Sequence, residues 1–299
     1  MTPDLPSLVA PLTEAEFMTR LRERTLTFVP GSGRNRWETL LDWDTLDHLL
    51  EASRYPLERL RVLKESTPIP ASFYTKDGQF DPAALAKLVD QGVSMILNRL
   101  DEYVPKLRQL CRDIAARTRE RSSAEAVYTS GRGGALQLHF DPEDIAVLQV
   151  AGTKRWQIHG ATINHPVKWT PEIPPPQGPP VFDKVLQPGD FLLLPAGHWH
   201  HCENGPERSL HLTILFIPPN GRHLMTSLAT KWLADPTFRQ PLTRHANAEE
   251  LSAREAALKA RLIEKIQALS LPDFLAEVEP APPAKKISMK GAPISSRRM

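Results

Sequence analysis

The spacing of apolar residues divides this chain into a mixed N-terminal third, a central region of short strands and a helical C-terminal part. Residues 45–64 and 82–118 have apolar side chains at helical spacing, interrupted at Gly92, and predict helices that flank a sheet. Residues 144–151 and 154–159 have the length and pattern of strands, and the glycine-containing link between them predicts a tight turn. The pattern predicts a mostly β protein with flanking helices.

From Arg222 onward the pattern becomes wholly helical. An apolar stripe with Glu and Lys opposite it is formed by Leu251, Ala256, Leu258, Leu262, Ile266 and Leu269. Such a stripe has to be buried, either against the rest of the chain or against another molecule.

Two stretches of the central region carry side chains suited to a metal. In GGALQLHFDPED, His139 and Asp141 are two residues apart on a predicted strand, so their side chains leave on the same face. In QPGDFLLLPAGHWHHCEN, His198, His200 and His201 follow an apolar run that predicts another strand. Two imidazoles and one carboxylate form the 2-His-1-carboxylate triad of non-haem Fe(II) oxygenases, which leaves coordination positions open.

The two stretches differ in how specific they are. An HxD pair is common by chance, and a strand histidine is often only a hydrogen-bonded structural residue. The second stretch, however, has glycine, proline, alanine, glycine, histidine and asparagine at every fixed position of the second cupin consensus, with His200 as the histidine and Asn204 as the asparagine. The chain therefore resembles the cupin superfamily, which implies a double-stranded β-helix, a flattened jelly-roll barrel, with a metal inside.

The chain departs from the general cupin pattern in a way that favours one branch of the superfamily. Asp141 stands where many cupins have a second histidine, and Ile145 and Ala146 stand where a glutamate ligand would follow. A site of three ligands with one carboxylate remains, which favours the JmjC-type oxygenases over four-ligand cupins. That branch implies Fe(II), 2-oxoglutarate as co-substrate and O2.

Besides the two stretches with metal-binding side chains, Lys154 is a candidate for binding an anionic ligand. Strand alternation places Lys154, Trp156 and Ile158 on one face, and a cation on an apolar face is costly unless it meets an anion. The distal carboxylate of 2-oxoglutarate would be such an anion. The alternative is a solvated lysine beside a turn glycine.

The segment DPEDIAVLQVAGTKRW looks like the JmjC hydroxylases related to the ribosomal oxygenases and to the asparaginyl hydroxylase that acts on hypoxia-inducible factor. The resemblance implies that Lys154 binds the 2-oxoglutarate carboxylate. It also implies that Tyr128, before the metal strand, and Ser209, in an SxHxT strand, are further co-substrate contacts. Helices after the barrel build a homodimer interface in the resembling enzymes, which favours a homodimer here.

Composition adds limits rather than a function. The chain has 299 residues, a formal net charge of +2 and an apolar fraction of 41%, which give no general attraction to nucleic acid or to acidic membranes. Two cysteines, Cys111 and Cys202, suit a reducing compartment. No stretch has the length of a membrane span and the N-terminus does not have the pattern of a signal peptide, so a cytoplasmic location is expected.

We expect a JmjC-type domain with N-terminal flanking helices over residues 1–220, a helical, possibly dimerising, segment over 221–273 and a disordered basic tail over 274–299. Six of the 29 prolines of the chain lie at 171–180, where they predict a stiff loop that either borders the substrate or serves as a spacer.

The sequence therefore favours an Fe(II)- and 2-oxoglutarate-dependent dioxygenase that hydroxylates a side chain of a protein or peptide. His139, Asp141 and His200 would hold the iron, and Lys154 would bind the co-substrate. A small-molecule hydroxylase and an N-methyl demethylase are alternatives within this class. A metal-binding cupin without catalytic activity is an alternative from a different class.

Overall fold

The computed structural model describes residues 4–31, 36–51, 55–131 and 136–280. The chain forms two compact units, one of residues Met1–Ile217 with Pro280–Met299 and the other of Pro218–Glu279. The first unit ends close to the boundary expected at residue 220.

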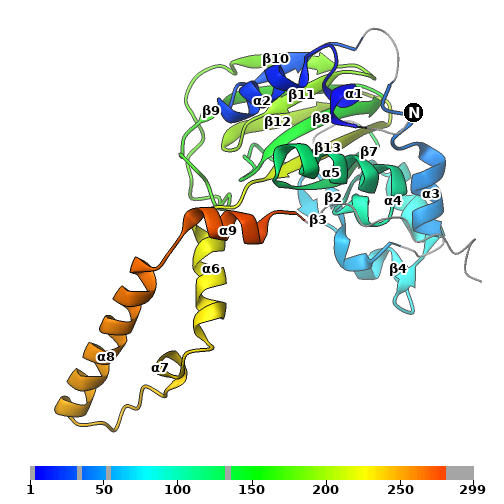
Figure 1. Cartoon of the computed structure of the whole chain (residues 1–299). Coiled ribbons are helices and arrows are strands. Elements are labelled where there is room, and N and C mark those ends of the chain that lie inside the picture. The colour runs from blue at the N-terminus through cyan, green and yellow to red at the C-terminus, as the bar shows by residue number, and fades with distance from the viewer. Residues whose placement is uncertain (1–3, 32–35, 52–54, 132–135, 281–299) are drawn as a thin grey trace, which may run out of the picture. The chain divides into compact units, whose positions relative to one another are not determined.

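Two antiparallel sheets form the centre of the first unit (Figure 1). The larger has eight strands in the spatial order β1 (Thr27–Val29), β11 (Phe191–Leu194), β8 (Asp144–Ala151), β13 (Ser209–Ile217), β7 (Arg121–Thr129), β6 (Ser94–Leu97), β2 (Leu60–Lys64) and β3 (Thr67–Pro68). The smaller has the order β10 (Phe182–Leu186), β9 (Lys154–Ala161) and β12 (His198–Asn204). A separate hairpin joins β4 (Thr75–Lys76) and β5 (Gln79–Phe80). The predicted double-stranded β-helix fold is confirmed.

At the turn formed by residues 151–153, the chain passes from the larger sheet to the smaller one. β8 pairs with β11 and β13, whereas β9 pairs with β10 and β12. The two strands and the turn were predicted, but β9 does not return beside β8 as a hairpin strand. Gly152 has a φ of +61°, and a Cβ there would lie 2.1 Å from the carbonyl oxygen of Arg208. Only glycine fits this corner.

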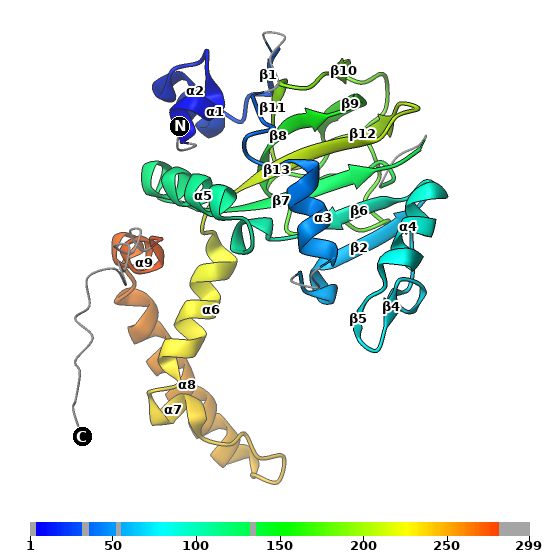
Figure 2. The same cartoon turned by 90° about the vertical axis from the view of Figure 1, so that its right-hand side faces the viewer.

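Apolar side chains fill two layers. A small cluster between the sheets joins Ile145, Val147 and Leu192 to Trp156 and Ile158. The larger cluster lies on the other face of the larger sheet, where helices cover it (Figure 2). These helices are α1 (Leu5–Val9), α2 (Glu14–Arg22), α3 (Trp43–Glu51), α4 (Pro82–Asp90) and α5 (Pro105–Thr118), with single 3-10 turns at Leu57–Arg59, Ala71–Phe73 and Leu100–Glu102.

The predicted flanking helices are correct only in part. Residues 60–64 form strand β2 and residues 94–97 form strand β6, although both lie inside segments with helical spacing. Helix α4 ends before Gly92, whose φ is +78°. A short apolar run fits a buried strand as well as a helix, and pairing of β6 with β7 decides in favour of the strand.

The second unit consists of helices α6 (Gly221–Trp232), α7 (Pro236–Arg239), α8 (Ala248–Gln267) and α9 (Leu271–Val278). Trp232 and Phe238 stack with ring centroids 5.6 Å apart. Helix α9 corrects the expected start of the tail at 274, because Ser270 caps a helix that continues to Val278. Residues 281–299, the rest of the predicted tail, lie outside the described part.

Of the helices in the described ranges, none is both long enough and apolar enough to cross a lipid bilayer.

Candidate active site

The two motif stretches meet through a single antiparallel bridge. The backbone nitrogen of His139 donates to the carbonyl oxygen of His200 at 3.1 Å, and the reverse hydrogen bond measures 2.7 Å. Directly before β12, the backbone nitrogen of Gly197 donates to the carbonyl oxygen of Asp141 at 2.9 Å. This pairing holds residues from two distant parts of the sequence opposite each other.

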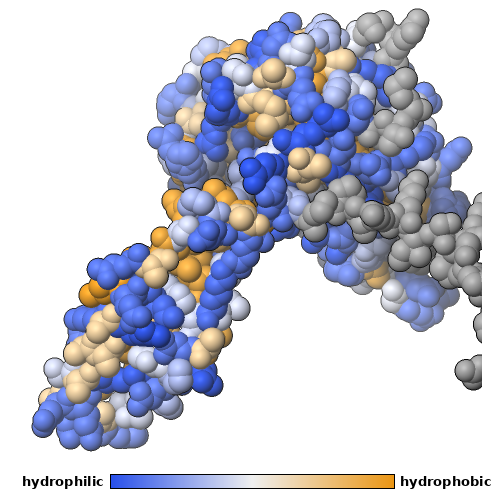
Figure 3. Space-filling model, viewed as in Figure 1, coloured by the Kyte–Doolittle hydropathy of each residue, from blue (hydrophilic) through white to orange (hydrophobic). Residues whose placement is uncertain are grey.

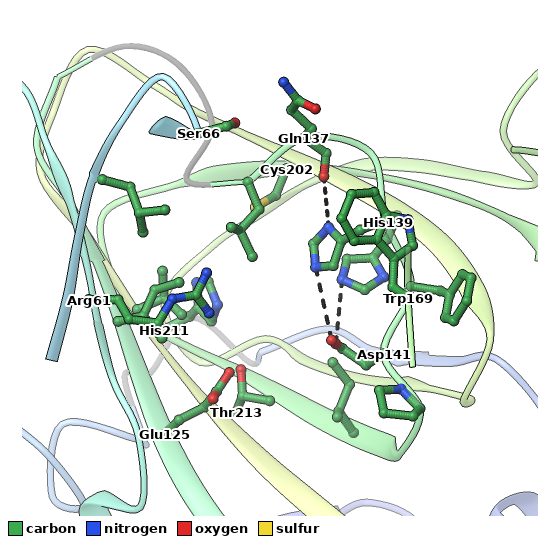
Figure 4. Close-up of a pocket in the computed structure, with 18 of the residues that line it drawn as sticks. Arg61, Ser66, Glu125, Gln137, His139, Asp141, Trp169, Cys202, His211 and Thr213 are labelled. Carbon is green, nitrogen blue, oxygen red and sulfur yellow. Dashed lines mark hydrogen bonds and ion pairs between the residues drawn. The ribbon is translucent and has the colours of Figure 1, made fainter. Parts of the chain in front are cut away.

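The three predicted ligands converge at this bridge. His139 Nε2 lies 3.9 Å from Asp141 Oδ1, and His200 Nε2 lies 3.6 Å from Asp141 Oδ2 (Figure 4). One ligand atom from each side chain lies within 4.8 Å of the others, a grouping found nowhere else among the described His, Cys, Asp and Glu residues. Such spacing suits three ligands on one face of a single ion.

Backbone contacts orient both imidazoles. His139 Nδ1 lies 2.7 Å from the carbonyl oxygen of Gln137, and His200 Nδ1 lies 3.0 Å from that of His198. Because a carbonyl oxygen only accepts, each Nδ1 carries a hydrogen, and each Nε2 is the nitrogen that faces Asp141. Burial, with the nearby His139 imidazole, lowers the pKa of His200 to about 4, so this ring is neutral at pH 7.

The two other histidines of the second motif do not join the group. His201 lies on the opposite side of the strand, with Nδ1 3.3 Å from the carbonyl oxygen of Leu136 and Nε2 3.7 Å from Glu203. The strand register shifts between His198 and His200, and His198 does not line the cavity around the triad. His200 alone of the three faces Asp141.

A cavity of about 490 Å³ opens beside the triad, between the two sheets (Figure 4). Its polar lining includes Arg61, Ser66, Glu125, Gln137, His211 and Thr213. Val167, Lys168 and Trp169 of the β9–β10 connection also line it, immediately before the proline-rich run at 171–180. No residue of 171–180 is among the described residues that line the cavity, so the contact of this run with the substrate stays a prediction.

Lys154 is completely buried, with no exposed surface, so it is not a solvated turn lysine. Its Nζ donates to Thr129 Oγ1 at 3.0 Å and lies 3.4 Å from His211 Nδ1. Burial lowers the pKa of Lys154 and lowers the pKa of His211 well below its ordinary value. Within the described ranges no carboxylate forms an ion pair with Lys154, which leaves a buried cation able to accept an anionic ligand.

Polar neighbours surround the Lys154 ammonium. Thr129 Oγ1 also lies 3.1 Å from the Ser94 hydroxyl, and Ser209 is the cross-strand partner of Thr129. Paired residues project from the same face, so Ser209 lies beside the group that holds Lys154. The buried Ser209 Oγ has no hydrogen-bond partner, which leaves it available to a ligand. Ser94, Thr129 and His211 were not among the residues predicted from the sequence to contact the co-substrate.

The position of Tyr128 differs from the co-substrate contact that the sequence resemblance implies. Its side chain lies on the other face of β7, where its ring is perpendicular to that of Trp43 with centroids 5.8 Å apart. Because strand side chains alternate, Thr129 takes the inward position that the sequence resemblance gave to Tyr128. A shift of one residue in a strand exchanges the two faces.

Glu125 is a residue of the cavity that the motifs did not indicate. It is the cross-strand partner of Thr213, and Figure 4 shows the two side chains together, across the cavity from Asp141. Burial and the Asp141 carboxylate raise the pKa of Glu125 to about 8, whereas Arg61 opposes the rise. The side chain is therefore mostly a neutral hydrogen-bond donor at pH 7.

Replacing Glu125 by glutamine should make the metal-free protein more stable at pH 9. Unfolded glutamate loses its proton near pH 4.5, whereas folded Glu125 retains it to about pH 8. Wild-type stability therefore falls as pH rises through this window, and the Glu125→Gln variant does not share this fall. We expect the free energy of unfolding of the variant to exceed that of wild type by about 1–3 kcal/mol at pH 9, after allowance for partial exposure of the side chain. At pH 4 the two should be equal. Urea unfolding at both pH values measures it, and equal gains at both would contradict the assignment.

Comparisons with known proteins agree with this geometry. Residues 102–224, which contain all three triad residues and Lys154, match the JmjC domain. The chain is 25% identical to the uncharacterised protein YxbC of Bacillus subtilis, over 89% of this chain and 86% of that protein.

Two further relatives have more informative names. The bifunctional lysine-specific demethylase and histidyl-hydroxylase NO66 of Drosophila persimilis is 26% identical over 70% of this chain, which spans only 31% of that protein. The ribosomal oxygenase YcfD of Escherichia coli, in complex with cobalt and 2-oxoglutarate, superposes with a TM-score of 0.56 at 18% identity, covering 85% of this chain and 67% of YcfD. At this identity the structural match establishes the fold.

Proposed function

Because the chain belongs to the JmjC-domain family, in the group similar to the ribosomal oxygenases, we propose that it is an Fe(II)- and 2-oxoglutarate-dependent dioxygenase that hydroxylates a side chain of a protein or peptide. The observation that carries the proposal is the His139–Asp141–His200 group beside a cavity, with an unpaired buried cation, Lys154, next to it. The three side chains of the triad suit a metal, and Lys154 suits the co-substrate.

The donor set fits Fe(II). Two imidazoles and a carboxylate would occupy one side of the ion, and both imidazoles turn their Nε2 atoms toward this position while Nδ1 contacts a backbone carbonyl. When bound, the iron supplies the coupled oxidation in which O2 and 2-oxoglutarate yield succinate and CO2 while a C–H bond of the substrate becomes C–OH. Cobalt and 2-oxoglutarate are present together in the YcfD complex, which supports this choice of metal class and co-substrate.

The chain's own residues bind and orient the co-substrate. Lys154 would pair with the distal carboxylate, and the Ser209 hydroxyl would donate the hydrogen bond that it now lacks. Thr129 and Ser94 fix the direction of the Lys154 ammonium. Trp156 stacks on His200 with centroids 5.7 Å apart. Its ring would exclude water from the space between the bound co-substrate and Lys154.

A protein substrate is supported by the relatives and by the shape of the site. NO66 is named as a hydroxylase of histidyl residues and a demethylase of lysine, and both are protein side chains. The cavity is lined by separate segments, among them β2 and the 167–169 stretch, that could contact a peptide on both sides. N-methyl demethylation and small-molecule hydroxylation remain alternative activities of the same site.

Succinate release tests the proposal. The purified protein with Fe(II), ascorbate, O2 and 2-oxoglutarate should form succinate, and more of it when a substrate peptide is present. Asp141→Ala is the control, because it removes the carboxylate ligand from a partly exposed position. No succinate above this control would favour the cupin without catalytic activity. A product heavier by one oxygen indicates hydroxylation, whereas loss of a methyl group with release of formaldehyde indicates demethylation.

We also infer a reducing, cytoplasmic setting from the two cysteines, Cys111 and Cys202, which are both buried and are not joined by a disulfide bond. Burial raises the pKa of Cys111 to about 12, so it remains a thiol. Cell fractionation with a tagged chain tests this location.

Homodimerisation is a further part of the proposal. Along helix α8 and just after it, Leu251, Ile266 and Leu269 of the apolar stripe are 48%, 57% and 36% exposed. Figure 3 shows apolar residues on the surface of this helical unit. A surface of this kind is usually covered, and twofold pairing of helices is the commonest way to cover it.

Introducing a charge on this stripe should dissociate the dimer. The Leu262→Glu and Ile266→Glu variants place a carboxylate in the apolar surface and should change the mass in light scattering from dimer to monomer at micromolar concentration. Ala257→Glu is the matched control, since Ala257 is exposed, is not three or four residues from any member of the stripe, and should leave the dimer intact when it carries the same charge. A monomeric wild-type chain would reject the homodimer.

A further inference from the structure

A second cavity, of about 860 Å³, lies on the opposite face of the strands that line the active site. On β6 and β7, Ile96 and Val127 line the active-site cavity, whereas Met95, Leu97 and Tyr128 line the second one. Helices α3 and α4 form its walls, and Figure 2 shows both helices over this face of the larger sheet. We call it the α3–α4 cleft. No residue lines both cavities.

Aromatic rings stand at one end of the cleft. Trp43 and Tyr128 meet at 90° with centroids 5.8 Å apart, and Trp43 is 39% exposed. An indole face that is open to solvent beside a second ring attracts organic cations. The remaining apolar lining, the floor of the cleft, contains Phe80 and the aliphatic side chains of Leu46, Leu50, Leu85, Val89, Met95 and Leu97.

Carboxylates surround this apolar floor. Asp47, Glu51, Asp90 and Glu207 line the cleft, and among the described residues that line it Arg208 is the single cation. Arg208 is 4.0 Å from Asp90, whereas no ion pair of Asp47, Glu51 or Glu207 is found in the described ranges. Burial, together with the charges of Glu51 and Asp44, raises the pKa of Asp47, and Arg208 opposes this rise only in part.

We propose that the α3–α4 cleft binds a lysine- or arginine-rich segment of a partner protein, with one cationic side chain against Trp43 and the aliphatic stems on the floor. The carboxylates belong to three separate segments, α3, the end of α4 and the 206–208 connection. A single small amine cannot meet all of them, but cations spaced along an extended peptide can. Charge complementarity therefore favours a peptide, and its binding is independent of the metal and of 2-oxoglutarate.

The test uses the full chain and a fluorescein-labelled peptide of sequence KLKFKLK, followed by fluorescence anisotropy. The Asp47→Asn/Glu51→Gln double variant should weaken binding by about 5- to 20-fold. Trp43→Leu should weaken it by about 3- to 10-fold while keeping the apolar contact. Glu38→Gln/Glu58→Gln is the matched control, because it removes the same charge from two exposed positions that do not line the cleft. The control should bind as wild type does.

Three outcomes would overturn the proposal. The two double variants could bind equally, which would reduce the effect to net charge. The peptide ELEFELE could bind as tightly as KLKFKLK, which would leave only apolar contact. Free lysine amide could compete at the same concentration as the peptide, which would replace the segment by a small amine. Melting temperatures of all variants exclude unfolding, and succinate formation should be unchanged, since none of these residues lines the active site.

Discussion

Replacing His200 by alanine should lower the affinity for Fe(II) by at least about 100-fold and abolish succinate formation. Loss of a residue that only supports a ligand already costs 10- to 100-fold in typical metal sites, so loss of the ligand itself should cost at least the upper value. We propose this role for His200 because its Nε2, and no other nitrogen of the three clustered histidines, faces Asp141.

His198→Ala and His201→Ala are the matched controls for this prediction. Both remove an imidazole from the same strand, but neither ring lines the cavity. Their metal affinities should stay within about threefold of wild type, the change expected when only a surface or second-layer contact is lost. Anaerobic titration with Mn(II), a redox-silent substitute for Fe(II), measures all three. Full Mn(II) affinity in His200→Ala, with loss in either control, would assign the ligand to another histidine.

The triad could be predicted from the sequence because its geometry is local. His139 and Asp141 share a face through strand periodicity, and the fixed spacing around His200 specifies a turn followed by a strand. The bridge between His139 and His200 follows from the fold that those motifs indicate. The inward direction of Lys154 was also predictable, since alternation with Trp156 and Ile158 sets it.

The remainder of the site depends on pairings between distant strands, which carry no spacing signal. Ser94 reaches Thr129 because β6 pairs with β7, and Glu125 faces the cavity because β7 lies beside β13. Tyr128 shows how sensitive such predictions are. The resemblance placed a contact near the end of β7, and an offset of one residue put the tyrosine outside and Thr129 inside.

Removing the charge of Lys154 should have two opposite effects, one on binding and one on stability. The Lys154→Met variant keeps a long apolar side chain but loses the ammonium. Loss of a charge-assisted pair in a desolvated pocket should cost about 2–5 kcal/mol, which corresponds to tens- to thousands-fold weaker 2-oxoglutarate binding. Metal affinity should be unchanged, because Lys154 contacts Thr129 and His211 rather than the triad.

The same variant should stabilise the protein in the absence of 2-oxoglutarate. A buried cation with no carboxylate partner destabilises the folded state, and an apolar side chain of similar shape relieves about 1–4 kcal/mol of that cost. Urea unfolding should therefore show a more stable Lys154→Met variant without ligand and a smaller gain in stability on adding 2-oxoglutarate than wild type shows. A purely structural lysine would give the reverse, a less stable variant with unchanged 2-oxoglutarate affinity. We therefore propose that the folded chain retains an unfavourable group at this position because the co-substrate supplies the missing anion.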